Sequence, residues 1–428
     1  MLRNMMIPGV TLVLLFMISM TSVTGGLNES QQAENTIAIY GDKIYTMAKS
    51  EDGSWSGVIE DGVVLIKDGK VVQVGLAGDI EIPEGSVIKK AAVVTPGLID
   101  ARSVVGLAGW LNIDHDSDHI ERSSPMQPEL EALDAYNTRE PLIDWVRSFG
   151  VTTLHTGHAP GQLISGQTFI VKTRGNTVDD AVVKRKAMVA CTLGSDALRS
   201  GKESPGTRSK QMAMLRQEFI KAQAHMDKQE KAEGDQEKEP PARNLRMEAL
   251  VSILKKDMPL MISAHAAVDI QNVLRLQKEL DISVVLQGGA ECYDFVEPLK
   301  KQGIPVIIHP TMMRSSGVGK NASMETSAKL IAAGVQIAMG SGYESYVPKT
   351  RVVLWEAAIA CAYGCSFEDA LGMITLSAAQ LLGVDDRIGS IEVGKDGDVA
   401  LYDGDPFEYT THCVGTVIEG QVVSEAIR

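Results

Sequence analysis

Cysteine is scarce in this chain of 428 residues. The five cysteines are odd in number and widely spaced, which excludes a disulfide framework. Two of them are four positions apart, but no further metal-ligating residues accompany them at metal-site spacing. The sequence therefore predicts that all five are small buried hydrophobic residues. They are Cys191, Cys292, Cys361, Cys365 and Cys413.

Basic residues are also in deficit. Lys and Arg number 41 against 55 Asp and Glu, which gives a formal net charge of −14 at pH 7. Proteins that bind nucleic acid present a basic surface, so this excess of acidic residues argues against a nucleic-acid partner. Hydrophobic residues make up 44% of the chain and charged residues 22%, as in ordinary globular proteins. The length fits one large barrel together with a smaller domain.

An apolar run near the N-terminus, Val10–Met20, is too short to span a bilayer. Arg3 precedes it, and Val23 and Gly25 could stand at positions −3 and −1 of a cleavage site. We therefore interpret residues 1–25 as a secretory signal peptide, with an uncleaved membrane anchor as the alternative. After cleavage we expect a secreted or periplasmic protein without membrane contact.

Short antiparallel strands are predicted at both ends of the chain. Asp68-Gly69 and Glu419-Gly420 each separate two apolar runs, and such pairs suit two-residue hairpin turns, which need positive φ. The expected strands are Thr36–Tyr40, Lys43–Met47, Val63–Ile66, Val71–Val74, Asp398–Tyr402, Val414–Ile418 and Gln421–Ser424.

The middle of the chain alternates apolar, strand-like runs with helical patterns, which indicates a parallel (β/α)8 barrel. One of the eight runs, Thr168–Lys172, could instead belong to a hairpin over the barrel mouth. The eight expected strands are Val93–Asp100, Val151–His155, Thr168–Lys172, Met188–Thr192, Leu260–His265, Ser283–Leu286, Pro305–His309 and Gln336–Met339. Helices are expected at Ala267–Glu279, Tyr293–Lys301 and Ser327–Ala333.

Two motifs give the chain a family resemblance. Thr95–Asp100 reads TPGLID, and Ile388–Asp398 reads IGSIEVGKDGD, followed by YDGDP at Tyr402–Pro406. Together they resemble the first barrel strand and the C-terminal signature of the amidohydrolase superfamily, close to its imidazolonepropionase-like branch. The resemblance implies an α/β fold in which a TIM barrel, residues 93–387, is inserted in a composite β-sandwich of residues 36–92 and 388–428. A charged insertion around 226–244 is expected to be a solvated helix or a disordered linker.

The resemblance also implies hydrolysis of non-peptide C–N bonds with a divalent, zinc-like metal that activates water. Such enzymes carry two histidines after strand one, often a lysine on strand four, single histidines after strands five and six, and an aspartate after strand eight. Only the strand-five histidine, His265, is kept here, and the expected fourth strand contains no lysine. The other ligand positions hold Arg102, Val104, Gly288 and Gly342.

Three more histidines are candidates for an altered metal site. His155 and His158 are expected near the end of strand two and His309 at the end of strand seven, where they could converge with His265. The alternative is that they are hydrogen-bonded polar residues in a crowded barrel end. His155 and His158 would face opposite sides if the strand ran through both. Arg102 would repel a metal but could hold an anionic ligand.

Two functional hypotheses follow. In the first, the chain is a non-catalytic or impaired amidohydrolase homologue that binds a small ligand, or it is the partner subunit of an active paralogue. In the second, His265 and one of the three other histidines hold a single metal ion that activates water for hydrolysis. We expect a small-molecule ligand or substrate, and an assembly that is either a homodimer or a heteromer with an active amidohydrolase paralogue.

Overall fold

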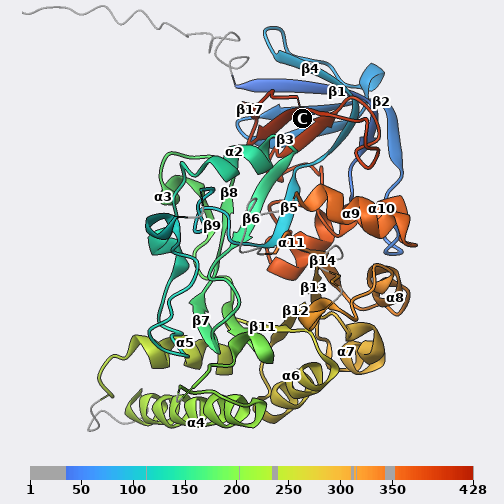
Figure 1. The fold of residues 1–428 in the computed structure, drawn as a ribbon. Coiled ribbons are helices and arrows are strands. Elements are labelled where there is room, and N and C mark those ends of the chain that lie inside the picture. Colours follow the sequence, from blue (N-terminus) through green and yellow to red (C-terminus); the bar gives the residue numbers. More distant parts are fainter. Residues whose placement is uncertain are drawn as a thin grey trace, which may run out of the picture.

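Figure 1 shows a computed structural model of the chain, which has a mixed α/β fold. A seven-stranded sheet lies at the top of the view, and two further sheets, of six and four strands, lie below it with most of the helices. Among the described residues, no helix combines the length and the apolar character needed to cross a bilayer. The predicted signal peptide and part of the charged insertion lie outside the described residues. These residues are 35–111, 113–201, 203–233, 240–309, 313–314, 316–342 and 352–427.

The seven-stranded sheet combines strands from the two ends of the chain. Its order is β17-β16-β15-β4-β1-β2-β3, and only the β1–β4 pair is parallel. Apolar side chains from both ends form one buried cluster against it. The strands are β1 (Thr36–Tyr45), β2 (Val58–Lys67), β3 (Lys70–Leu76), β4 (Val87–Pro96), β15 (Val399–Tyr402), β16 (Cys413–Ile418) and β17 (Gln421–Ser424).

Both predicted hairpin turns are confirmed. Asp68 and Gly69 have φ of 50° and 81°, and Glu419 and Gly420 have φ of 46° and 72°. The two turns also meet, because Gly397 donates to the Gly69 carbonyl at 2.7 Å and accepts from the Gly420 amide at 3.1 Å. The N-terminal and C-terminal hairpins are therefore fastened to each other through one glycine.

A predicted break at Gly41 is wrong. We expected two strands on either side of Gly41-Asp42, but β1 continues through both residues. A Cβ on Gly41 would lie 2.9 Å from the Val94 Cγ2. This glycine therefore allows the close approach of β4, and it does not make a turn.

The strand expected over Val93–Asp100 is also divided. Val93 and Val94 pair with β1 and β15 in the seven-stranded sheet, whereas β5 (Leu98–Ser103) starts a different sheet. The chain passes from one sheet to the other at Gly97, where a Cβ would overlap the Thr152 side chain. The apolar run reads as continuous because both halves are buried.

The other two sheets contain the strands predicted for the barrel. Their orders are β14-β13-β12-β11-β10-β7 and β5-β6-β8-β9. One buried cluster contains side chains from strands of both sheets and from α11 (Leu376–Leu382). The strands are β6 (Val151–Thr156), β7 (Ile164–Gln167), β8 (Phe169–Lys172), β9 (Val182–Lys184), β10 (Val189–Thr192), β11 (Leu260–Ala264), β12 (Val284–Gly288), β13 (Val306–Ile308) and β14 (Ile337–Met339).

The least regular part is the expected third barrel strand. β8 pairs with β6 and β7 pairs with β10, both in antiparallel register, with only Thr168 between β7 and β8. The prediction of a parallel strand at Thr168–Lys172 is therefore wrong. Apolar patterning marks burial but does not fix the direction in which a buried strand runs.

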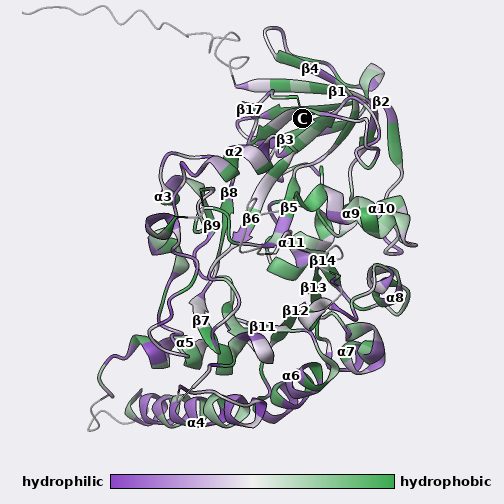
Figure 2. Cartoon of the chain, viewed as in Figure 1, coloured by the Kyte–Doolittle hydropathy of each residue, from purple (hydrophilic) through white to green (hydrophobic). Residues whose placement is uncertain are grey.

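The predicted helices are present within a few residues of their expected bounds. In the charged insertion, residues up to Glu233 belong to the long helix α4, which is largely hydrophilic in Figure 2. The remaining helices are α2 (Pro141–Arg147), α3 (Val178–Ala181), α4 (Arg208–Glu233), α5 (Leu245–Leu254), α6 (Ala267–Leu280), α7 (Val296–Gln302), α8 (Thr326–Ala332), α9 (Val353–Ala362) and α10 (Phe367–Gly372).

Candidate functional site

A cavity of about 570 Å³ opens beyond the C-terminal ends of the parallel strands. His265 reaches it from the end of β11, and His309 from the end of β13. Gly288 and Gly342, which stand where metal ligands are expected from the sequence, line the same cavity. Its other lining residues are Ile120, Arg122, Pro160, Gly161, Asp196, Gln287, Ala290, Arg314, Ser316, Gly317, Val318, Gly319 and Ala322.

His265 is fixed by the turn that follows β12. Its backbone carbonyl accepts from the Glu291 amide at 3.0 Å, and the Glu291 Oε2 accepts from the Ala267 amide at 2.5 Å. The same glutamate thus holds the histidine backbone and the start of α6. Burial lowers the pKa of His265, while the carboxylates of Asp196 and Asp269 act in the opposite direction. The ring is therefore a neutral hydrogen-bonding group at neutral pH.

The two glycines at ligand positions make room for the two histidine rings. A Cβ on Gly288, where φ is +89°, would overlap the His265 ring. A Cβ on Gly342, where φ is +70°, would lie 2.6 Å from the His309 Nδ1. Positive φ also disfavours any side chain at these positions. With this backbone, the histidine rings therefore occupy the space that side chains at positions 288 and 342 would need.

His309 has an acidic neighbour on the side away from Gly342. Its Nε2 lies 3.2 Å from the Oε1 of Glu356 on α9, and both side chains are buried. The two atoms are close but do not form a hydrogen bond of good geometry, so the carboxylate places negative charge beside this ring nitrogen. No sequence pattern marked Glu356, because its place beside His309 depends on how α9 packs against β5 and β14.

His155 lies in β6 and is fully buried, with both ring nitrogens in use. Nδ1 is 2.7 Å from the Ala101 carbonyl, and Nε2 is 2.7 Å from the Thr168 Oγ1. Because a carbonyl only accepts, Nδ1 carries the proton and Nε2 accepts from the threonine. Burial lowers the pKa of His155 to about 3, which keeps this neutral form. His155 therefore has no free lone pair to offer a metal.

His158 lies beyond the end of β6, so the expected alternation along one strand does not apply to it. Its side chain is buried against Gly166, where a Cβ would lie 2.6 Å from the His158 Cδ2. Burial lowers its pKa to about 4, with a further contribution from the positive charge of Arg102. His158 is absent from the cavity lining that the described residues form, so the structure does not bring it together with His265 and His309 there.

Arg102 is buried at the end of β5, and its guanidinium does not line the cavity formed by the described residues. It donates to the backbone carbonyls of Ser103 at 2.8 Å, Gly157 at 3.4 Å and His158. Burial lowers the pKa of Arg102 to about 10, so the side chain is still cationic at neutral pH. Val104, at the second position of the motif, packs against Ala108 and Ala159.

Asp100 lies two residues before Arg102 and ends the TPGLID motif, but no sequence pattern marked it as a site residue. Its Oδ1 accepts from the amides of Arg102 at 3.1 Å and Ser341 at 2.9 Å, which ties β5 to the end of β14. Burial nevertheless raises the pKa of Asp100 to about 6. At neutral pH the folded protein therefore carries a buried carboxylate that binds a proton more readily than an aspartate in water.

We expect Asp100→Asn to change how stability depends on pH. Between about pH 4 and pH 6 the folded Asp100 holds a proton that the unfolded chain has lost, so the stability it contributes falls as the pH rises through this window. The difference in unfolding free energy, wild type minus Asp100→Asn, should decrease across the window and stay constant above it. Chemical denaturation from pH 4 to pH 8 measures it, and a difference that rises with pH would contradict the assignment.

The described residues do not fit the metal site that the family resemblance implies. They contain no group of three or more His, Cys, Asp or Glu side chains placed to hold a metal ion. Of the residues at the expected ligand positions, Arg102 is a cationic guanidinium, and Gly288 and Gly342 supply no side-chain ligand atom. His265 and His309 remain as the two imidazoles that face one cavity.

Comparisons with known proteins agree with this architecture. The model of the amidohydrolase family matches residues 324–424. A solved amidohydrolase from Thermotoga maritima is 30% identical, covers 91% of this chain and 100% of its own, and has a TM-score of 0.84. An imidazolonepropionase from Sphingopyxis alaskensis is 25% identical over 86% of this chain and 91% of its own. An amidohydrolase, tasK, from Hapsidospora irregularis is 23% identical over 86% of this chain, which spans only 40% of that protein.

Proposed function

We propose that this chain, which belongs to the amidohydrolase superfamily in its imidazolonepropionase-like branch, binds a small molecule at the barrel mouth. In this proposal the binding does not use the metal pair that the family resemblance implies. We infer that the six- and four-stranded sheets form one barrel, since strands of both contribute to a single buried cluster. The seven-stranded sheet would then be part of the composite β-sandwich. On this proposal, hydrolysis of C–N bonds is impaired or absent.

The proposal depends on one observation above the others. The rings of His265 and His309 fill the space that side chains at positions 288 and 342 would need. A ligand in the cavity would meet two imidazoles, the Gln287 side chain and the backbone of two glycines. Neutral imidazole both donates and accepts, so these groups suit a compact molecule with amide or heterocyclic nitrogen and oxygen atoms.

A second candidate function is a hydrolase with a single metal ion. It is favoured by the fact that His265 and His309 line the same cavity from neighbouring regions of one sheet. Amidohydrolases typically use a divalent metal, which supplies an activated water when bound. In this chain the two histidines would be the ligands, and the remaining positions would have to be filled by water or substrate.

One experiment separates the two candidates. The mature protein is purified without chelators or a histidine tag, its zinc, manganese and iron are measured, and small amides and heterocycles are screened by thermal shift. We expect no stoichiometric metal, even after incubation with each ion, and ligands that raise the melting temperature of the wild type but not of His265→Ala. The matched control is His412→Ala, since His412 is exposed and pairs with Asp403.

Stoichiometric metal together with hydrolysis that disappears in His265→Ala would overturn the binding proposal in favour of the single-metal hydrolase. The predicted signal peptide also leads us to propose that the protein acts outside the cytoplasm. Its assembly, as a homodimer or with an active amidohydrolase paralogue, is likewise a proposal, and mass measurement of the purified protein in solution tests it.

A further inference from the structure

The Arg102 side chain forms a connection at the base of the barrel mouth. Its residue is 2% exposed, and its guanidinium donates to carbonyls on two separate segments. One carbonyl belongs to Ser103, at the end of β5. The other two belong to Gly157 and His158, which follow β6. The side chain therefore joins the end of one strand to the connection that leaves the next strand.

The segment that follows β6, which Arg102 contacts, leads into the wall of the cavity. Pro160 and Gly161, which line the cavity, come two and three residues after His158. The Arg102 backbone is fixed from the other side, because its carbonyl accepts from the Gly342 amide at 2.8 Å. A Cβ on Gly340 would lie 2.7 Å from the Arg102 Cβ, so the residue that follows β14 also packs closely against Arg102. Three parts of the barrel mouth thus meet at one arginine.

The chemistry of this contact requires arginine. A guanidinium presents up to five N–H groups in a rigid plane, whereas an ammonium is a compact point charge on a flexible stem. Carbonyls from two segments can therefore be bound together by one planar group. The buried charge is compensated by these carbonyl dipoles and by the nearby Asp100 carboxyl group.

We propose that the Arg102 guanidinium is a built-in cation that holds the barrel mouth together at the strand position where the family resemblance places the first metal ligand. It is a positioning residue, since it orders Pro160 and Gly161 in the cavity wall without lining the cavity. The inference concerns the integrity of the barrel mouth and holds whether the cavity binds a ligand or a substrate.

Chemical rescue tests the inference. Arg102→Ala leaves a hole that is lined by the three carbonyls and has the size of a guanidinium group. We expect this variant to melt at a clearly lower temperature than the wild type. Millimolar guanidinium chloride, far below denaturing concentrations, should restore a large part of the lost melting temperature. Equal concentrations of sodium chloride, ammonium chloride or zinc chloride should not restore it, because none of these ions supplies a planar set of donors.

Arg216→Ala is the matched control. Arg216 makes a bidentate ion pair with Glu279 on the surface, so its removal also deletes an arginine–oxygen contact, but leaves no enclosed hole. Its melting temperature should change little and should not respond to guanidinium. If Arg102→Ala does not fold, Arg102→Lys keeps the positive charge without the planar set of donors. We expect it to fold with a melting temperature below that of the wild type, and zinc should not raise it; a melting temperature equal to that of the wild type would overturn the inference.

For Arg102→Ala, two outcomes would overturn the inference. One is an Arg102→Ala protein that melts like the wild type. The other is a destabilised variant that zinc rescues and guanidinium does not, which would indicate a vacated metal site. Because the readout is the melting temperature of protein without ligand, a failure here differs from a failure of the binding proposal, which would show as wild-type protein that binds none of the screened compounds.

Discussion

Replacing Lys172 with methionine should lower the free energy of unfolding by about 3–5 kcal/mol, as is typical when one partner of a buried ion pair is removed. Lys172 belongs to β8, and its Nζ contacts Asp398 and lies 3.0 Å from the Asp396 Oδ2. All three side chains are at most 4% exposed. Methionine keeps the volume but leaves two carboxylates buried without their shared cation.

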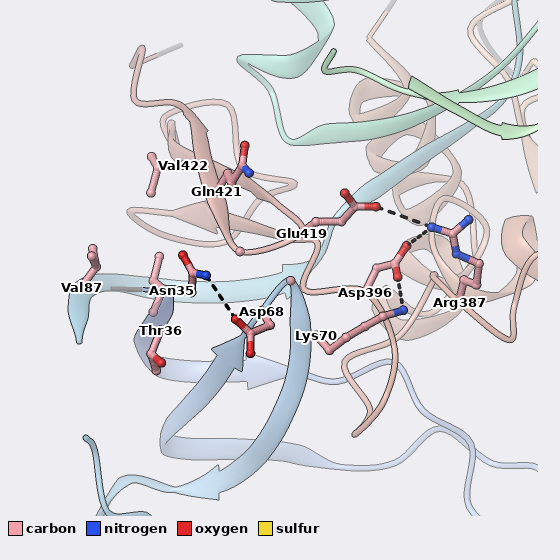
Figure 3. Close-up of a pocket in the computed structure, with 13 residues that line it drawn as sticks. Asn35, Thr36, Asp68, Lys70, Val87, Arg387, Asp396, Glu419, Gln421 and Val422 are labelled. Atoms are coloured by element: carbon pink, nitrogen blue, oxygen red, sulfur yellow. Dashed lines mark hydrogen bonds and ion pairs between the residues drawn. The ribbon is translucent and has the colours of Figure 1, made fainter. Parts of the chain in front are cut away.

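The matched control is Lys70→Met. Lys70 contacts the other oxygen of the same Asp396, at 2.6 Å, but its side chain is 49% exposed. Figure 3 shows Lys70 and Arg387 both paired with Asp396 among the residues that line a pocket. Both cations are partly exposed, so solvent weakens each ion pair. We expect a loss of less than about 1 kcal/mol for this variant. Chemical denaturation compares the two, and equal losses would show that burial does not set the strength of this network.

The second large effect is expected for Gly288→Ala. The new Cβ would be strained by the positive φ, at about 1–2 kcal/mol, and would overlap the His265 ring. Displacing the ring should add about 1–3 kcal/mol, the usual cost of overpacking. The binding of any ligand found by thermal shift should be lost as well, because the ring would leave its place in the cavity.

Gly303→Ala separates the two contributions. Gly303 also has positive φ, at +62°, but nothing lies within 4 Å of the position its Cβ would take. This variant should show only the backbone cost and should keep ligand binding. Chemical denaturation and thermal shift measure both effects. If both variants lose the same stability, then His265 is not held against Gly288. The same argument predicts that Gly288→His alone does not restore a metal site.

Sequence patterns predicted the elements of the fold better than the way in which the elements join. The hairpins at Asp68-Gly69 and Glu419-Gly420 follow from local backbone preferences, so they were predictable. The division at Gly97 was hidden because both halves of the run are apolar and buried. The direction of β8 was hidden because burial on both faces leaves no trace of strand polarity.

For the site, the motifs pointed to positions that the structure places around one cavity, but they did not indicate what those residues contact. The sequence identified His265 and the replacements at 288 and 342, and only the structure shows that each glycine adjoins a histidine ring. Arg102 was expected as a possible anion ligand, yet its guanidinium turns to carbonyls of the next strand connection. Side-chain direction at a strand end depends on neighbours that are distant in sequence, which no local pattern records.

The seven-stranded sheet has a consequence for how the chain acquires its fold. Until β15 (Val399–Tyr402) has been synthesised, one edge of β4 has no partner, although its residues are largely apolar. An unpaired apolar edge invites pairing with other chains. β15 can pair with β4 only after the long segment between the two strands has emerged, so truncations that remove β15, β16 and β17 should yield chains that aggregate during folding and not shorter soluble proteins.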